Sequence, residues 1–287
     1  LTKSKFILGM ECPTKLYYAD KKEYSNLKSD DSFLEGLAEN GYQVAELARC
    51  YHPEGILIEE ENNQEAITKT NELLKRDQVT IFEAAFSYQN LFVRVDIAIK
   101  NGNSIKLVEV KSKSFDSLEL SPFMTKKGEI YSDWRPYIYD IAFQKYVVMK
   151  AFPEMNITCY LMLADKSTTC PTDGLNQKFR IIKIADRVII KLTSPLTEGE
   201  LKQPILNKVS VDAEIRYVFG NEKFMNDYYF SDYIHHLANH YQNGEKIKPI
   251  PGRVCKTCEF KSDEITNLKS GFEECWQQCF SFDKKSC

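Results

Sequence analysis

Residues 91 to 112 contain the pattern that establishes the central sheet. It reads Leu91-Phe-Val-Arg-Val-Asp-Ile-Ala-Ile-Lys100, then Asn101-Gly-Asn103, and then Ser104-Ile-Lys-Leu-Val-Glu-Val-Lys-Ser112. Apolar β-branched residues at every second position predict strands over 91–100 and 105–112, and the Asn-Gly turn between them predicts a hairpin. A similar run over 79–88, linked through Gln89-Asn90, adds a third strand and completes a meander.

Helical spacing of apolar residues predicts the elements on either side of this meander. A helix is expected over 3–24 with a break at Pro13, and further helices over 32–50 and 64–76. After the meander, the pattern predicts a helix over 136–151, a buried strand over 157–164 and an aromatic-rich helix over 227–241. The stretch from 170 to 220 has no clear pattern. These elements divide the chain into three segments, 1–60, 61–220 and 221–287. The first and last segments are expected to form one compact unit.

Composition places the chain among globular proteins. Of its 287 residues, 43% are hydrophobic and 28% charged, and the net charge is −3. A nucleic-acid partner would therefore be bound by a local basic patch rather than by the overall field of the protein. No run approaches 18 apolar residues, which excludes a membrane span. The first residues lack the pattern of a secretory peptide, which favours a cytoplasmic location.

Two acids and one lysine in the hairpin carry the chemistry. Asp96 and Glu109 come from adjacent strands, so their carboxylates can converge on one Mg²⁺ or Mn²⁺ together with the backbone carbonyl of Val110. Lys111 lies two residues after Glu109 and therefore on the same face of its strand. Such an ammonium can position the attacking water or stabilise charge on a phosphate. The pattern favours metal-dependent phosphodiester hydrolysis, with a solvated strand face as the alternative.

Nine cysteines, five of them in the last 33 residues, indicate a metal centre. Their odd number and the missing secretory signal argue against a disulfide framework. Cys255, Cys258, Cys275 and Cys279 are spaced much like the ligands of a zinc ribbon. Four thiolates can equally hold a [4Fe–4S] cluster. Spacing alone does not separate Zn²⁺ from an iron–sulfur cluster.

The hairpin motif resembles the PD-(D/E)XK nuclease superfamily, with Asp96 as its Asp and Glu109-Val110-Lys111 as its E-x-K. It is most similar to the branch that includes RecB and AddB nuclease domains and the iron–sulfur nucleases of CRISPR adaptation. The resemblance implies an α/β fold, a restriction-endonuclease-like mixed sheet flanked by helices. It also implies DNA cleavage with Mg²⁺ or Mn²⁺ and a metal-cluster lobe built from the two chain ends.

The same resemblance implies roles for residues outside the hairpin. The helix before the sheet has Ala45 where relatives carry a metal-binding His, so Glu46 is the nearest substitute. Gln144 matches the Gln of the helix that follows E-x-K, and Glu83 matches a supporting strand acid. The implied cluster ligands are Cys12, Cys255, Cys258 and Cys275, with Cys279 as the alternative fourth ligand.

The function expected from these residues is cleavage of single-stranded DNA or DNA ends. Lys113, Lys126, Lys127 and Arg135 are candidate phosphate contacts because they follow the active strand. Two alternatives stay open: an inactive nuclease-like module that binds DNA or assembles with other proteins, and a zinc scaffold with no enzymatic role. The cysteine motif ends close to Cys287, which suggests a further domain or subunit.

Overall fold

A computed structural model describes residues 1–28, 32–184, 187–221, 224–225, 228–262 and 267–280. The side chains of 32–39, 184 and 187 are outside this description, as are Asp227 and Cys287. The helices are α1 (Lys3–Glu11), α2 (Lys15–Tyr18), α3 (Ser32–Cys50), α4 (Asn63–Leu73), α5 (Arg135–Ala151), α6 (Glu198–Lys202), α7 (Asp212–Gly220), α8 (Phe230–Asn243) and α9 (Gly271–Cys279), with the 3₁₀ turns η1 (Leu175–Lys178) and η2 (Arg253–Thr257). The strands are β1 (Ile56–Leu57), β2 (Gln78–Tyr88), β3 (Leu91–Asn101), β4 (Ser104–Phe115), β5 (Asn156–Asp165), β6 (Phe179–Ile184), β7 (Arg187–Leu192) and β8 (Leu206–Ser210).

The main sheet has six strands in the order β1-β2-β3-β4-β5-β8. The meander β2-β3-β4 is antiparallel, whereas β4 and β5 run parallel and are joined through α5. Strand β8 pairs antiparallel with β5 at one edge, and β1 pairs parallel with β2 at the other. The fold is therefore mixed α/β, a mixed six-stranded sheet with flanking helices.

Most of the elements expected from the sequence are confirmed within one to three residues. The helix expected over 3–24 is partly wrong, because the chain turns after Tyr18 and Tyr24 then pairs with Lys269 near the other chain end. The stretch from 170 to 220, which had no clear pattern, contains β6, β7, α6, β8 and α7. Of these, β8 supplies the edge strand of the main sheet.

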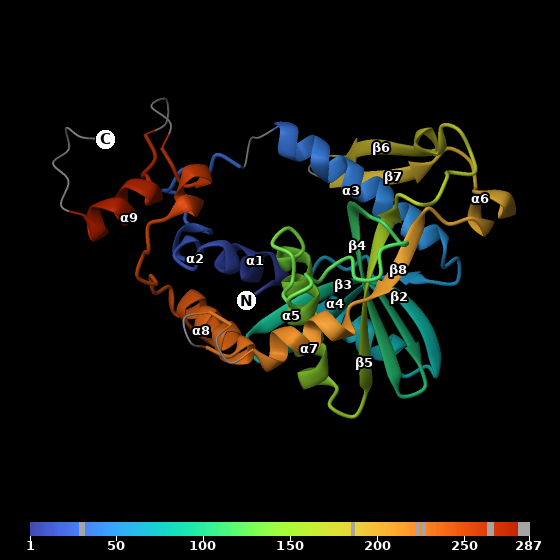
Figure 1. The fold of residues 1–287 in the computed structure, drawn as a ribbon, viewed down its shortest axis with the longest axis horizontal. Coiled ribbons are helices and arrows are strands. Elements are labelled where there is room, and N and C mark those ends of the chain that lie inside the picture. Colours follow the sequence, from blue (N-terminus) through green and yellow to red (C-terminus); the bar gives the residue numbers. More distant parts are fainter. Residues whose placement is uncertain (29–31, 185–186, 222–223, 226–227, 263–266, 281–287) are drawn as a thin grey trace.

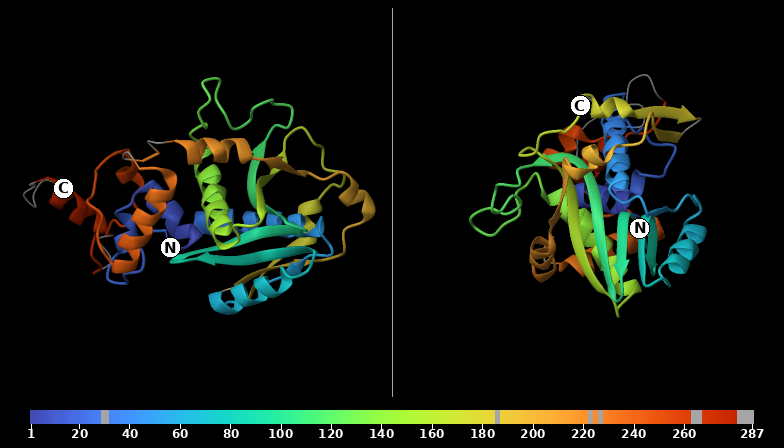
Figure 2. Two further views of the ribbon diagram at one scale, coloured as in Figure 1. Left: turned by 90° about the horizontal axis from the view of Figure 1, so that it is seen from below. Right: turned by 90° about the vertical axis from the view of Figure 1, so that its right-hand side faces the viewer.

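Helices flank the main sheet (Figures 1 and 2), and two apolar cores join them to it. The larger core includes side chains of β2–β5 together with α5, α1 and α8, and in it Phe6 stacks on Phe143 at 4.4 Å between ring centroids. The second core joins Val108 and Val110 to Leu47 of α3 and Phe179 of β6. The larger core contains residues from all three expected segments, so these segments share one interior.

Helix α2, in the N-terminal part of the chain, lies beside the segment that holds η2, in the C-terminal part, at one end of the molecule (Figure 1). The amide of Ser25 donates to the Lys269 carbonyl, and the Thr14 hydroxyl donates to the Ile247 carbonyl. Tyr18, Tyr24 and Phe260 form a small core of their own next to Cys258 and Cys275. Helix α3, although it belongs to the first 60 residues, packs instead on the main sheet. Among the helices described, none is long and apolar enough to cross a bilayer.

Candidate metal centres

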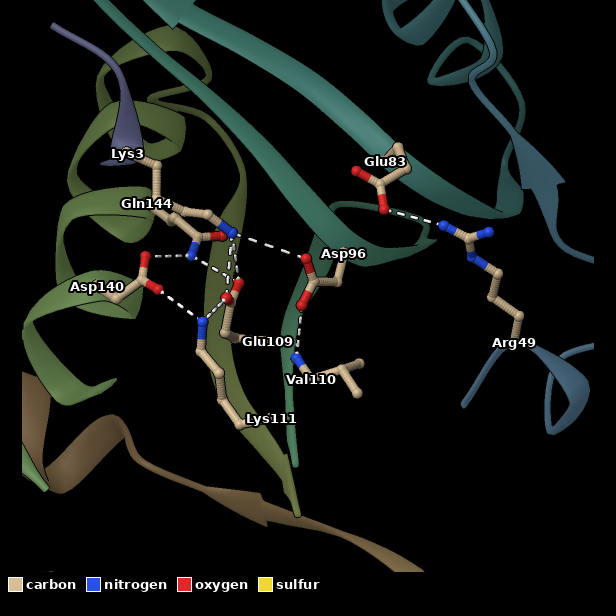
Figure 3. Close-up of polar contacts among 9 residues, drawn as sticks. All are labelled: Lys3, Arg49, Glu83, Asp96, Glu109, Val110, Lys111, Asp140 and Gln144. Carbon is tan, nitrogen blue, oxygen red and sulfur yellow. Dashed lines mark hydrogen bonds and ion pairs between the residues drawn. The ribbon is translucent and has the colours of Figure 1, made fainter. Parts of the chain in front are cut away.

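The hairpin strands stop pairing at the two acids. Residues 97–101 of β3 pair with 104–108 of β4, and Asp96 and Glu109 are the next residue on each strand. At this point the Val110 amide donates to Asp96 Oδ2 at 2.7 Å. Val110 was predicted to offer its carbonyl to a metal, and the contact found here is made by its amide. Both carboxylates lie at the end of the paired ladder, next to Val110 and Lys3 (Figure 3).

Glu109 is the centre of a buried polar network. Its side chain is 1% exposed and accepts three donors: Lys3 Nζ at 3.0 and 3.1 Å, Lys111 Nζ at 2.5 Å, and Gln144 Nε2 at 2.8 Å. These donors come from α1, β4 and α5, so three elements distant in sequence meet at one carboxylate. A buried carboxylate is costly unless it is paired and hydrogen-bonded, and here it is both. Asp96, Glu109, Lys111 and Gln144, predicted as one site, therefore belong to one network.

Asp140 completes this network, and sequence reasoning did not assign it a role. It lies one helical turn before Gln144 on α5, and its carboxylate accepts from Gln144 Nε2 at 2.9 Å and from Lys111 Nζ at 3.0 Å. Asp140 thus fixes the direction of the lysine and of the amide at once. The signal for it was present in the sequence, because residues i and i+4 share a helix face.

Lys3, the first residue of α1, is the second group that sequence reasoning missed. Its ammonium lies 3.7 Å from Asp96 Oδ1 as well as 3.0 Å from Glu109 Oε1. A single cation is therefore shared by the two acids predicted to hold a metal. The contacts span 93 and 106 residues of chain (Figure 3), and no local pattern could have indicated them.

Burial and charge separate the acids of this site. Burial and the neighbouring Glu109 raise the pKa of Asp96 to about 7. Burial also opposes ionisation of Glu109, but Lys111 and Lys3 outweigh it and hold the pKa of Glu109 below its ordinary value. Burial and Glu109 raise the pKa of Asp140. Lys111 loses hydration by burial, yet Glu109 and Asp140 raise its pKa above the ordinary value, so it is an ammonium at neutral pH.

The raised pKa of Asp96 predicts a pH dependence of stability in protein stripped of divalent ions. Between about pH 4 and about pH 7 the folded chain keeps a proton that the unfolded chain releases. The free energy of unfolding contributed by Asp96 therefore falls as pH rises through that window. We expect the stability of wild type relative to Asp96→Asn, measured by urea unfolding in chelator, to decrease from pH 4 to pH 7 and then level off. Parallel curves for the two proteins would contradict this assignment.

A second polar chain lies beside Asp96 and involves Glu46. Arg49 of α3 contacts Glu46 Oε2 at 3.3 Å and Glu83 Oε1 at 3.0 Å. Glu83 contributes to the raised pKa of Asp96, and its backbone has a φ of +55°, a strained conformation for a residue with a side chain. Glu46, predicted as a third metal ligand, thus forms its ion pair with Arg49. Glu83 is the acid next to Asp96.

The predicted phosphate contacts separate into two groups. Lys113 donates to Asp133 Oδ2 at 2.9 Å and lies over the Trp134 ring, so its charge is already partnered. Lys126, Lys127 and Arg135 are exposed in and after the loop that joins β4 to α5. Arg135 also donates from Nε to the Ile130 carbonyl at 3.1 Å, which leaves the rest of its guanidinium toward solvent.

The donor set at the acid pair fits a hard divalent cation. Two carboxylates already share one positive charge, and Gln144 Oε1 is a buried acceptor without a hydrogen-bond partner among the described residues. Oxygen donors of this kind suit Mg²⁺ and Mn²⁺. Within the described part of the chain, no three His, Cys, Asp or Glu side chains lie close enough together to ligate a single ion.

Four cysteines line one cavity between the chain ends. They are Cys12, Cys255, Cys258 and Cys275, and the cavity encloses about 410 Å³ not filled by protein atoms, part of it open to solvent. Apolar residues such as Ile250, Phe260 and Trp276 form much of the remaining wall. The fourth predicted iron–sulfur ligand, Cys275, is therefore brought together with the other three. Cys279 has another environment, because its Sγ contacts the Pro249 carbonyl at 3.3 Å.

Hydrogen-bond donors and the ammonium group of a lysine lie near these cysteines. The Gly252 amide donates to Cys255 Sγ at 3.4 Å, and the Tyr18 hydroxyl lies 3.5 Å from Cys275 Sγ. Lys15 also lines the cavity, although its side chain is only 3% exposed, and it is held by Glu259 at 2.6 Å. Burial raises the pKa of Cys258, an effect that Lys15 partly offsets. Amide donors and cations of this kind stabilise thiolates that bind iron or zinc.

Comparison with known proteins adds nothing to this geometry. No family model and no curated protein matches the chain. Any functional conclusion therefore depends on the chemistry of the two sites themselves.

Proposed function

We propose that this chain is a metal-dependent nuclease that hydrolyses phosphodiester bonds in DNA, on single strands or at ends. The proposal includes membership of the PD-(D/E)XK superfamily, in its RecB-, AddB- and CRISPR-adaptation-like iron–sulfur branch with a restriction-endonuclease-like core. The observation that carries it is the contact network of Asp96, Glu109 and Lys111 at the point where two strands part. Gln144 joins this network from the helix that follows.

Each side chain has a distinct role in this proposal. Asp96 and Glu109 would hold Mg²⁺ or Mn²⁺, which supplies Lewis-acid activation of a water and of the phosphate when bound. Lys111, kept protonated by Glu109 and Asp140, donates to a phosphate or water oxygen and stabilises negative charge there. Its raised pKa argues against proton abstraction by this lysine. Asp140 and Gln144 keep Lys111 and Glu109 in position.

The thiol cavity would hold a [4Fe–4S] cluster through Cys12, Cys255, Cys258 and Cys275. In such a cluster each thiolate binds a different iron, so four cysteines are needed around one space, and four cysteines are among the residues that line this cavity. A zinc ribbon would use Cys279 in place of Cys12, and the separate environment of Cys279 gives that ligand set less support. The cluster would be structural, because it would join Cys12 to Cys255, which have 242 residues of chain between them.

Binding of the DNA backbone would use the exposed cations Lys126, Lys127 and Arg135 near the carboxyl end of β4. Phosphate contacts of this sort make binding salt-dependent and independent of sequence. Lys113 has less charge to offer, since Asp133 already neutralises it.

The test is cleavage of end-labelled single-stranded DNA by the full chain, purified without oxygen. We expect cleavage with Mn²⁺ and none in excess chelator, with activity restored when Mn²⁺ is added back. Glu109→Gln keeps the size of the side chain but removes the central charge, so the expected rate is that of the reaction without protein. If wild type and Glu109→Gln give the same products at the same rate, the enzyme proposal fails and the inactive binding module gains support.

A further inference from the structure

The acid pair of this protein already contains a cation from the protein itself. Lys3 Nζ is within 3.1 Å of both oxygens of Glu109 and 3.7 Å from Asp96 Oδ1. It therefore lies between the two carboxylates that are proposed to hold a divalent ion. Asp96, Glu109 and Asp140 together with Lys3 and Lys111 make three negative and two positive groups when all are ionised. Without Lys3, the acids would repel one another more strongly.

The two lysines of the site are held differently. Lys111 contacts both Glu109 and Asp140, so a second carboxylate keeps it in place if the contact with Glu109 is lost. Lys3 contacts the proposed metal ligands themselves, and its side chain remains 23% exposed. A flexible four-carbon stem can move this ammonium toward solvent without movement of the backbone.

Helix α1 is anchored independently of this ammonium. Phe6 is fully buried and stacks on Phe143, and the Phe92 amide donates to the Leu1 carbonyl at 3.0 Å. Loss of the Lys3 contacts therefore does not require the helix to leave the sheet. The side chain can exchange while its helix stays docked.

We propose that Lys3 is an exchangeable counter-ion of the acid pair, an ammonium that occupies the space between Asp96 and Glu109 in metal-free protein and withdraws when a divalent cation binds. The inference rests on the proposed metal site and deepens it. Each binding event then includes the free energy of breaking the Lys3 contacts. The apparent dissociation constant for the cation equals the intrinsic constant divided by the fraction of molecules in which Lys3 has left the acid pair.

The experiment measures Mn²⁺ binding rather than activity. Full-length wild type, Lys3→Met and Lys3→Arg are titrated with Mn²⁺, and free Mn²⁺ is followed by its electron paramagnetic resonance signal. Lys5→Met is the matched control, because it removes the same charge from the same helix at a residue that pairs with Asp20. An Asp96→Asn, Glu109→Gln double variant identifies binding elsewhere on the protein. Thermal melts show that each variant is folded.

We expect Lys3→Met to bind Mn²⁺ about tenfold more tightly than wild type, as follows when a competing state that holds most molecules is removed. Lys3→Arg keeps the charge and should stay near wild type, as should Lys5→Met. Equal or weaker binding by Lys3→Met would overturn the exchange while leaving the metal site intact. If wild type and the double variant bind Mn²⁺ equally, the acid pair is not a metal site, and both proposals fail.

A measurement on unaltered protein covers the case in which Lys3→Met does not fold. Brief acetylation followed by mass spectrometry gives the reactivity of Lys3 relative to Lys5 in the same molecule. Exchange predicts that saturating Mn²⁺ raises this ratio several-fold, because an amine released from two carboxylates reacts faster. An unchanged ratio under saturating Mn²⁺ would overturn the proposal.

Discussion

Replacement of Lys111 by Ala is expected to lower Mn²⁺-dependent DNA cleavage by about 10²- to 10⁴-fold, the range for loss of a positioned acid–base or charge-stabilising group. The ammonium contacts Glu109 of β4 at 2.5 Å and Asp140 of α5 at 3.0 Å, which holds it beside the acid pair. Its removal takes away the proposed donor to the phosphate oxygen while both acids remain. We therefore expect a fall in kcat, measured with saturating DNA and Mn²⁺, and little change in Mn²⁺ affinity.

The control for this variant is Lys106→Ala. Lys106 lies on the same strand β4 but is exposed at the other end of the hairpin. It tests whether loss of a positive charge from β4 is itself enough to weaken binding of DNA. Lys106→Ala should retain activity within about twofold of wild type, as expected for a surface substitution. If Lys111→Ala is as active as Lys106→Ala, Lys111 has no role in the proposed catalysis.

Replacement of Cys12 by Ser is expected to abolish iron binding by the full chain and to destabilise it strongly. Cys12 lines the thiol cavity from the N-terminal side, and its three partners come from the last 33 residues. Closing a loop of 242 residues contributes on the order of 5 kcal/mol in the chain-entropy treatment of cross-links, a free energy that is lost with the ligand. Iron content by mass spectrometry and the visible absorption of protein purified without oxygen measure the loss.

Cys279→Ser separates the two metal hypotheses. The Cys279 thiol donates to the Pro249 carbonyl, and Cys279 is not among the described residues that line the cavity, so the [4Fe–4S] proposal expects the iron content and colour of Cys279→Ser to match wild type. A zinc ribbon predicts the reverse, with metal lost in Cys279→Ser and kept in Cys12→Ser. If the purified protein is colourless and contains zinc, and if zinc binding is lost in Cys279→Ser, the zinc hypothesis is supported and the [4Fe–4S] proposal fails.

Local pattern was sufficient to predict the elements that form the acid pair. Alternation of apolar residues gave β2, β3 and β4, and the Asn-Gly turn set the register that brings Asp96 near Glu109. Both features depend on neighbours in sequence, so they can be recognised without tertiary information. Helix α5 was equally clear from its apolar spacing, whereas Gln144 was predicted only because the nuclease branch that the hairpin motif resembles carries a Gln on this helix.

The missed residues are those whose role depends on tertiary contacts. Lys3 reaches Glu109 across 106 residues, and nothing around it in the sequence differs from an ordinary helix start. Strand β8 is five residues long and three of them are polar, so it has too few apolar positions for a period to be recognised. Glu46 was placed on the correct helix, yet Arg49, one turn away, takes its charge.

Helix α1 has Lys3 at its first residue and is followed directly by Cys12. Nine residues of α-helix span roughly 14 Å, so a single short helix connects the acid site to the thiol site. If the thiol site holds iron, oxidative loss of the cluster would release the Cys12 end of α1. The position of Lys3 at the other end of the helix would then be less well fixed. If the acid site is the proposed nuclease, its activity would then depend on iron supply.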